Sequence, residues 1–308
     1  MRSGVFISIL ILALTGYGLY RLFFKEKEVV FQANLIMVDT SSVNSILLSN
    51  NPFSGGELSF LREGKEWIIS NEQLHIKANP LIMQALLASV REIKTNEVVT
   101  TDPKSWKIYG VDGVQGIRVR LYDEKKRLED FVVGKSDINP QTQAPISYLR
   151  LSGANEVYVV NGDLLAQFNQ NFTNSRSRLI LSLDSSVEIT ELEYQLPDTS
   201  WRIEQAPEGW KSGDLLLDSL QMSQYLQQLR YLSGDIFADH FDEVEGGKYL
   251  YQTVTIQGKN LTEPVVITCY RDTTLKMPFI LHSTQNQEAF FASDSTGIYH
   301  KIFKKVND

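Results

Sequence analysis

The chain has 308 residues, of which 43% are hydrophobic, 10% aromatic and 22% charged, a composition that excludes disordered, collagen-like and disulfide-rich proteins. Its 30 Lys and Arg residues are outnumbered by 37 Asp and Glu residues, and the formal net charge of -7 argues against nucleic acid as a partner. The single cysteine, Cys269, cannot form an internal disulfide bond, and we expect it to be buried in a strand.

The first predicted element is an apolar segment at the N-terminus, which carries no charged side chain from Ser3 to Tyr20. Continued to residue 24, with Arg21 at the level of the lipid headgroups, it has about 22 residues and spans roughly 33 Å as a helix, enough to cross a bilayer. We therefore predict a membrane anchor over residues 1–28. A cleaved signal peptide and a buried core helix are the alternatives, although a good A-x-A cleavage site is missing.

The charges that flank this segment bear on its orientation. Arg2 and the amino group lie on one side, and Arg21, Lys25 and Lys27 lie on the other. By simple counting, the positive-inside rule would put the C-terminal side in the cytoplasm. The rest of the chain is acidic, so we do not expect it to dock onto an anionic lipid surface.

The remainder of the chain contains two similar halves. Residues 58–69 align with residues 192–203, and in each segment an alternating apolar run, a turn and a second run containing Trp67 or Trp201 predict a hairpin. Just upstream, an Asp-Thr-Ser-Ser-Val sequence that begins at Asp39 recurs as Asp-Ser-Ser-Val. The recurring residues are of the core type, which favours a structural or binding module over an enzyme. A site in the cleft between the halves would escape this test.

A helix follows each hairpin. Apolar side chains recur every three or four positions in residues 79–93, where Asn79 is the predicted N-cap and Pro80 the first helical residue, and again in residues 218–232. The predicted buried faces comprise Ile82, Leu86, Val90 and Ile93 in the first helix and Met222, Leu226, Leu229 and Leu232 in the second. Further strand pairs follow, and residues 164–168 and 298–303 predict two closing helices.

This order of elements predicts an α+β fold with antiparallel meander sheets and helices packed on them. A doubly wound parallel sheet would need regular alternation of strands and helices, which is absent. Turn-forming residues in 169–183 mark the boundary. We therefore expect three parts: the anchor (1–28), a first α+β repeat (29–170) and a second α+β repeat (171–308).

No pattern of a cofactor site is convincing. Residues 134–136 have the Gly-Lys-Ser ending of a phosphate-binding loop, but the required preceding glycine is Glu129, so we interpret them as a turn after a strand. A run of spaced glycines precedes a strand instead of opening a helix, which argues against dinucleotide binding. Those glycines are Gly110, Gly113 and Gly116. We expect no cofactor.

Catalytic and metal sites are not expected either. The four histidines have no metal-ligand spacing, and the acidic residues 239–245 lack the alternating order of a calcium loop, so we interpret this segment as solvated. Asp239 and His240 could act together as a general base, but no partner residue in the sequence supports this. Asn171 could be a glycan acceptor, but its sequence context gives no support. The histidines are His75, His240, His282 and His300.

A further set of patterns carries a resemblance to a known family. They are Val38-Asp39 with residues 43–48 before the Trp67 strand, residues 106–111, residues 131–134, and Tyr148-Leu149-Arg150 before residues 157–160. Together with the anchor, they resemble the bacterial domain of unknown function 4340 family over nearly the whole chain. The resemblance implies a protein encoded beside an ABC-type transport system related to the gliding-motility transporter, with its body outside the cytoplasm. It provides no catalytic residues.

We therefore expect a non-enzymatic accessory protein, held in the cytoplasmic (inner) membrane by its N-terminal helix, with its body on the periplasmic side. It would act as a scaffold for the membrane or extracytoplasmic subunits of an ABC transporter. The alternative is an anchored binding protein for a small molecule, sugar or peptide in the cleft between the repeats, which a large interdomain pocket lined by several exposed aromatic residues would favour. An anchored hydrolase would need convergent His and carboxylate side chains.

Overall fold

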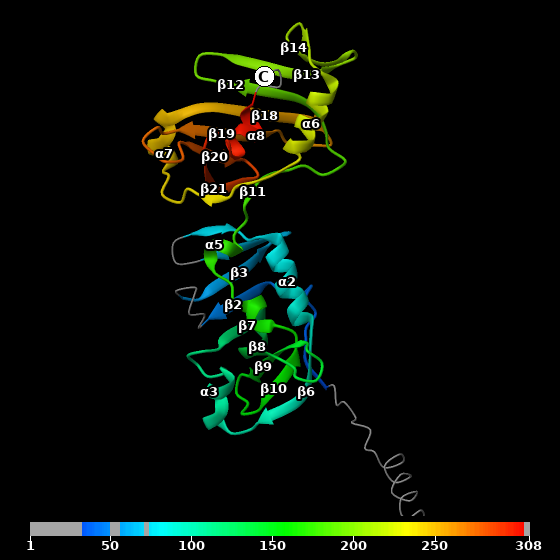
Figure 1. Cartoon of the computed structure of the whole chain (residues 1–308), viewed down its shortest axis with the longest axis vertical. Helices are drawn as coiled ribbons and strands as arrows, with labels where there is room; N and C mark the ends of the chain where they lie inside the picture. The colour runs from blue at the N-terminus through cyan, green and yellow to red at the C-terminus, as the bar shows by residue number, and fades with distance from the viewer. Residues whose placement is uncertain (1–32, 50–55, 71–73, 305–308) are drawn as a thin grey trace, which may run out of the picture.

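The computed structural model describes residues 33–49, 56–70 and 74–304. Two sheets follow each other along the long axis of the molecule, and the chain crosses between them near α5 (Phe172–Ser175) (Figure 1). The predicted anchor over residues 1–28 lies outside the described residues. Within the described ranges, none of the helices has the length and apolar character needed to cross a membrane.

The first sheet contains ten strands in the described part of the chain, and all neighbouring strands are antiparallel. Their order is β1 (Ala33–Met37), β6 (Glu92–Thr100), β10 (Val157–Asn161), β9 (Pro145–Leu151), β8 (Lys126–Ile138), β7 (Ile117–Asp123), β2 (Ser45–Ser49), β3 (Leu58–Glu63), β4 (Glu66–Ser70) and β5 (His75–Lys77). Helices α2 (Pro80–Arg91) and α4 (Leu164–Phe168) contact each other and cover one face, where the core includes Phe60, Phe131 and Phe168.

The second sheet has nine strands among the described residues, again all antiparallel. Their order is β15 (Leu215–Leu216), β14 (Gly209–Ser212), β13 (Ser200–Ala206), β12 (Glu188–Gln195), β18 (Leu250–Lys259), β19 (Val265–Arg271), β20 (Phe279–Ser283), β21 (Asn286–Ser293) and β17 (Ile236–Phe237). A short pair, β11 (Leu179–Ser182) with β16 (Tyr231–Ser233), lies beside it. Helices α6 (Ser219–Leu229) and α8 (Ile298–Phe303) pack against a separate core.

These antiparallel, strand-rich layers with few helices confirm the predicted α+β class. The two predicted hairpins are also confirmed, because β3 pairs with β4 and β12 pairs with β13 in the expected segments. The ring of Tyr194 stacks on the ring of Trp201 across the second hairpin, with centroids 4.9 Å apart. Cys269 is buried in β19 as expected, and burial raises the pKa of its thiol.

The caps of both long helices follow from their sequences. Asn79 Oδ1 accepts a hydrogen bond from Leu81 N at 3.0 Å, and Asp218 Oδ1 accepts one from Gln221 N at 2.8 Å. Such caps satisfy backbone donors that the first helical turn leaves unpaired. Pro80 occupies the start of α2 as predicted, where its missing N–H costs no hydrogen bond.

The predicted buried faces were partly wrong. Helix α2 also buries Met83 and α6 also buries Tyr225, whereas the predicted Ile82 and Leu226 pack against the cores but are only partly buried. The helices also end earlier than predicted, so Ile93 and Leu232 are buried from the strands that follow. The apolar pattern continued across the helix ends because helix and strand bury side chains in the same core. The remaining predicted side chains are Leu86, Val90, Met222 and Leu229, which are buried as expected.

Candidate functional site

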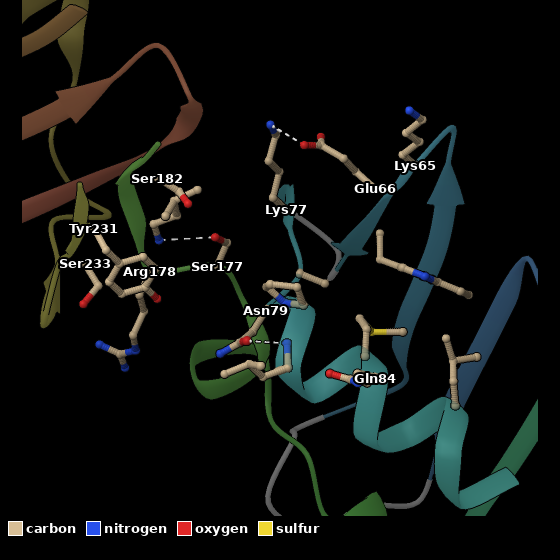
Figure 2. Close-up of a pocket in the computed structure, with 17 residues that line it drawn as sticks. Lys65, Glu66, Lys77, Asn79, Gln84, Ser177, Arg178, Ser182, Tyr231 and Ser233 are labelled. Carbon is tan, nitrogen blue, oxygen red and sulfur yellow. Dashed lines mark hydrogen bonds and ion pairs between the residues drawn. The ribbon is translucent and has the colours of Figure 1, made fainter. Parts of the chain in front are cut away.

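A cavity of about 590 Å³ lies where the two sheets meet, and we call it the junction cavity. One wall comes from the β3–β4 turn, β4, β5 and the first turns of α2, and the other from β11, β16 and the residues just before β11. Figure 2 shows Lys77, Asn79 and Gln84 on the first wall, opposite Ser177 and Tyr231 on the second. The volume falls in the range of about 300 to 1,000 Å³ that is usual for ligand sites.

Backbone hydrogen bonds hold the two walls at this separation. Ser177 N donates to Lys77 O at 2.6 Å, and Asn79 N donates to Ser175 O at 2.7 Å. Ala78 and Arg176 form an isolated antiparallel bridge between these two bonds. The segment that leaves α5 therefore continues the edge of the first sheet before it enters β11, which fixes the floor of the cavity.

Side chains close one rim. Lys77 Nζ lies 2.9 Å from Glu66 Oε1 and donates to the carbonyl oxygen of Gln285 at 3.1 Å (Figure 2 shows the ion pair). The amide of Gln285 in turn pairs with the backbone of Ser182, through bonds of 2.7 and 3.2 Å. The β20–β21 turn is thereby joined to both walls. An ammonium group has three donors, so Lys77 keeps one for a further acceptor.

The interior of the junction cavity is mainly apolar. Met83 and Ala78 are buried at its base, and Trp67, Leu87 and Leu179 are half-buried around them. Leu81 and Tyr231 stand at the mouth and are 71% and 66% exposed. Exposed large apolar side chains beside a cavity are what an amphipathic ligand would cover. The aromatic side chains of the lining are Trp67 and Tyr231, of which only Tyr231 is exposed, fewer than the several exposed aromatic residues that would favour the binding-protein alternative.

The charged residues of the walls are mostly cationic. Lys65, Lys77 and Arg178 line the cavity together with a single carboxylate, Glu66. Arg178 donates to the carbonyl of Asp235, and its guanidinium lies 5.0 Å from the centroid of Phe237. A wall with an excess of positive charge contrasts with a chain whose net charge is -7. The lining of the cavity thus has three cationic side chains and one carboxylate on a protein that is acidic overall.

Arg176 is buried beside the second wall and connects it to the loop after β17. Both terminal nitrogens of Arg176 bind the carboxylate of Asp239, at 2.7 and 2.8 Å, and its guanidinium stacks 3.4 Å from the centroid of Phe237. The sequence allowed Asp239 to pair with His240 as a base. Its carboxylate instead belongs to this ion pair, and the ion pair connects the inter-sheet segment to the loop after β17.

A second cavity, of about 580 Å³, lies in the second sheet unit beside this loop. Three of the four carboxylates that line it have partners. Asp239 pairs with Arg176, Asp242 caps the short helix α7 (Glu243–Gly246), and Asp272 accepts bonds from Thr274. The acidic cluster is thus engaged in local structure, and the junction cavity is the stronger candidate site.

Other side chains that the sequence raised as site candidates make local hydrogen bonds. His75 is hydrogen-bonded to Ser70, and His282 to the carbonyl of Gln287, at 2.8 and 2.9 Å. Asn171 Oδ1 caps α5 by accepting from Asn174 N at 2.9 Å. Within the described ranges, the structure brings together no group of three or more His, Cys, Asp or Glu side chains able to hold a metal ion.

The Gly-Lys-Ser segment lies within β8 and is not the turn that we predicted. A Cβ built on Gly134 would lie 2.2 Å from Tyr109 O, so the glycine allows residues 109–111 to pack directly on the strand. Lys135 Nζ binds the carbonyl of Ile108 at 3.0 Å. This contact explains the glycine by close backbone approach.

Sequence reasoning identified none of the residues of the junction cavity as site residues. One available signal was Leu81, an apolar residue on α2 that does not belong to the predicted buried face. An isolated apolar side chain on a helix is ordinary, so this signal has meaning only beside the opposite wall. That wall lies about a hundred residues later in the chain.

Comparison with known proteins places the chain. The model of the family described as Domain of unknown function (DUF4340) matches residues 67–247, more than half of the chain, and includes most of both cavity walls. This match is shorter than the nearly complete coverage that we expected. Neither a curated protein nor a solved structure matches the chain. The chain belongs to the DUF4340 family.

Proposed function

We propose that this protein is a binding protein whose ligand occupies the junction cavity. The observation that supports this most strongly is an apolar cavity of suitable volume between two separately packed cores, with exposed Leu81 and Tyr231 at its mouth. A ligand seated there would contact both walls and bury apolar surface, which is the main favourable term in binding.

We further propose that the two sheet units are copies of one ancestral unit. The strand order from β6 to β5 in the first sheet corresponds, strand for strand, to the order from β17 to β15 in the second. The long strand β6 corresponds to the two consecutive short strands β16 and β17 together, so the pair of β1 with β6 corresponds to the pair of β11 with β16. The two long helices, α2 and α6, occupy the same place in each order.

Local hydrogen bonds support the same correspondence. Asp39 Oδ1 accepts from Ser41 N at 2.9 Å, and Asp184 Oδ1 accepts from Ser186 N at 2.8 Å. These bonds lower the pKa of both carboxyls, through Ser41 at Asp39 and through Ser186 at Asp184.

The correspondence changes the alignment of the tryptophans. Ala78 N donates to Trp67 O at 2.7 Å, and Leu217 N donates to Trp210 O at 2.8 Å, each just before a helix cap. Trp67 therefore corresponds to Trp210, one strand later than the Trp201 chosen from sequence. Both hairpins have the same alternating pattern, so the sequence does not by itself decide between Trp201 and Trp210.

A matched pair of substitutions tests ligand binding at the cavity. Leu81 and Leu220 are each the second residue of a long helix and are 71% and 68% exposed, but only Leu81 lines the junction cavity. Glu at this helix position is favourable for folding because it interacts with the helix dipole. Leu81→Glu places a charge against the apolar ligand, whereas Leu220→Glu places one outside the cavity.

The probe is N-phenyl-1-naphthylamine, a neutral dye that fluoresces in apolar sites. We expect saturable binding to one site on the wild type and on Leu220→Glu, and at least about tenfold weaker binding to Leu81→Glu, because an unpaired charge against an apolar ligand costs more than about 1.4 kcal/mol. Equal binding by the three proteins, or no saturable binding to the wild type, would contradict the proposal.

We also propose the setting in which this binding occurs: a non-enzymatic accessory protein, anchored through residues 1–28 with its body outside the cytoplasmic membrane, beside an ABC-type transport system. The uncharged run from Ser3 to Tyr20 and the family resemblance support this setting. Protease added to intact spheroplasts should digest the body. Protection of the body, or consistent absence of transporter subunits from detergent pull-downs of the full chain, would count against it.

A further inference from the structure

We infer that the ligand of the junction cavity is an amphipathic anion, a small molecule with an apolar body and a carboxylate or phosphate group. This inference rests on the proposed binding function and specifies its ligand class. It comes from comparing the cavity wall with the corresponding wall of the second unit, which lines no junction.

The first argument is the charge at corresponding positions. The β3–β4 turn carries Lys65, where the β13–β14 turn carries Glu208, as the registers of the two hairpins show. On the next strand, Lys77 and Leu216 occupy corresponding positions. Lys77 is the strand partner of Ile68, and Leu216 is the strand partner of Lys211. The wall that faces the cavity thus has Lys65 and Lys77 where its counterpart has Glu208 and Leu216, and it has one carboxylate, Glu66, where its counterpart has Gly209.

The helix caps differ in the same sense. The N-cap of α2 is the neutral Asn79, and the N-cap of α6 is the anionic Asp218. The partial positive charge of a helix N-terminus is therefore uncompensated at the junction cavity and compensated at the counterpart. Asn79 and the first turn of α2 line the cavity, so this charge acts at the same place as the lysines.

The opposite wall adds positive charge to an apolar surface. Arg178 lines it, and its counterpart in the first unit is Ala33, because Leu179 pairs with Ser233 as Asn34 pairs with Lys94. The guanidinium has five N–H groups, of which the carbonyl of Asp235 uses one. The guanidinium of Arg178 lies against Phe237 on this wall, whereas Lys65 and Lys77 line the first wall together with the apolar Trp67 and Leu81. Cationic side chains and apolar side chains in one lining complement an amphipathic anion.

Four probes of equal chain length separate the headgroups: octanoate, octyl phosphate, octanol and octyltrimethylammonium. Each competes with N-phenyl-1-naphthylamine for the wild-type protein. We expect at least one anion to displace the dye at a tenfold lower concentration than the cation does, with octanol between them. The anion that competes better identifies the headgroup, and added salt should weaken its binding more than that of octanol.

Two substitutions give each position the residue of the second unit. Lys65→Glu changes an exposed turn residue, and Lys77→Leu removes the ammonium at the rim. Each should weaken the better anion about three- to tenfold and leave octanol unchanged. Lys125→Glu, in the exposed turn of the β7–β8 hairpin, is the control and should change neither.

The outcomes are distinct. If the cation competes as well as the anions, or if Lys65→Glu leaves the preference unchanged, the ligand class is overturned while dye binding still supports a binding function. If none of the four probes displaces the bound dye, the ligand class is also overturned. If the dye itself does not bind, the proposed function fails first.

Discussion

Arg176 and Asp239 form a two-bond ion pair in which the side chain of Arg176 is 2% exposed and that of Asp239 is 42% exposed. The arginine lies in the segment between the sheets, and the aspartate lies in the loop that follows β17. A buried guanidinium needs this carboxylate because an isolated charge away from water is strongly unfavourable. The ion pair thus makes the placement of the inter-sheet segment depend on the second unit.

We expect Asp239→Asn to lower the free energy of unfolding by about 3 kcal/mol, because it leaves the buried guanidinium of Arg176 without its counter-charge. Urea unfolding followed by tryptophan fluorescence measures this change. Asp198→Asn is the control, since Asp198 is exposed in the β12–β13 turn. Equal stability of the two variants would mean that the stacked ring of Phe237 alone compensates the charge.

We expect the folded protein to lose stability in acid, because the carboxylate of Asp130 becomes protonated. Burial raises the pKa of this carboxyl, but hydrogen bonds from Arg118 and Ser152 outweigh burial and lower the pKa below its ordinary value. A carboxyl with a lowered folded-state pKa stabilises the fold above its unfolded pKa of about 3.9, and this stabilisation is lost as the pH falls through the folded pKa.

Asp130→Asn should therefore cost about 2 kcal/mol at pH 7, the order of a charged hydrogen bond. The difference in unfolding free energy between variant and wild type should shrink steadily from pH 5 toward pH 3. Urea titrations at each pH provide the test. A difference that stays constant over this range would show that the carboxylate charge is unimportant and that only its shape matters.

We expect the folded protein to lose stability at alkaline pH, because the hydroxyl of Tyr225 becomes deprotonated. Its hydroxyl lies 2.6 Å from that of Tyr194 and donates to the carbonyl of Ile302 at 2.5 Å, and burial raises its pKa to about 12. A raised pKa means that this stabilisation is complete below the unfolded pKa of about 10 and is lost as the pH rises through the folded value. Wild-type stability should fall between pH 10 and 12, and Tyr225→Phe should show a shallower fall. An unchanged slope in the variant would exclude Tyr225 as the titrating group.

Gly134→Ala should destabilise the first sheet. The added Cβ would lie 2.2 Å from Tyr109 O and 2.7 Å from Val111 Cγ1, so the packed segment must move, at a cost of about 1 to 3 kcal/mol. Gly113→Ala is the matched control, because nothing lies within 4 Å of the place that its new Cβ would take. Thermal unfolding of both variants gives the comparison, and a neutral Gly134→Ala would show that residues 109–111 can shift freely.

Elements that depend on local sequence were predictable. The hairpins, the cap at Asn79, the start of α2 at Pro80 and the closing helices all follow from turn residues and spacing within about fifteen positions. Where two segments have the same local pattern, this information is insufficient. Trp201 and Trp210 both follow a turn between alternating strands, and the match of Trp210 with Trp67 that we propose depends on the bond from Leu217 N to Trp210 O.

The junction cavity could not be predicted for a different reason. Its walls are brought together by contacts such as Lys77 with Gln285, which are separated by most of the chain and have no shared pattern in sequence. Residues such as Ser177 and Ser233 have ordinary loop and strand character when read alone. Their role as cavity lining depends on where the second unit sits against the edge formed by β5.

The bridge between Ala78 and Arg176 and the hydrogen bonds beside it connect the edge of the first sheet to the segment that enters the second unit. A ligand in the adjoining junction cavity would contact both sheet units at once and oppose bending at that connection. Ligand binding would then reduce the bending between the two sheet units, an effect that reaches parts of the molecule far from the ligand.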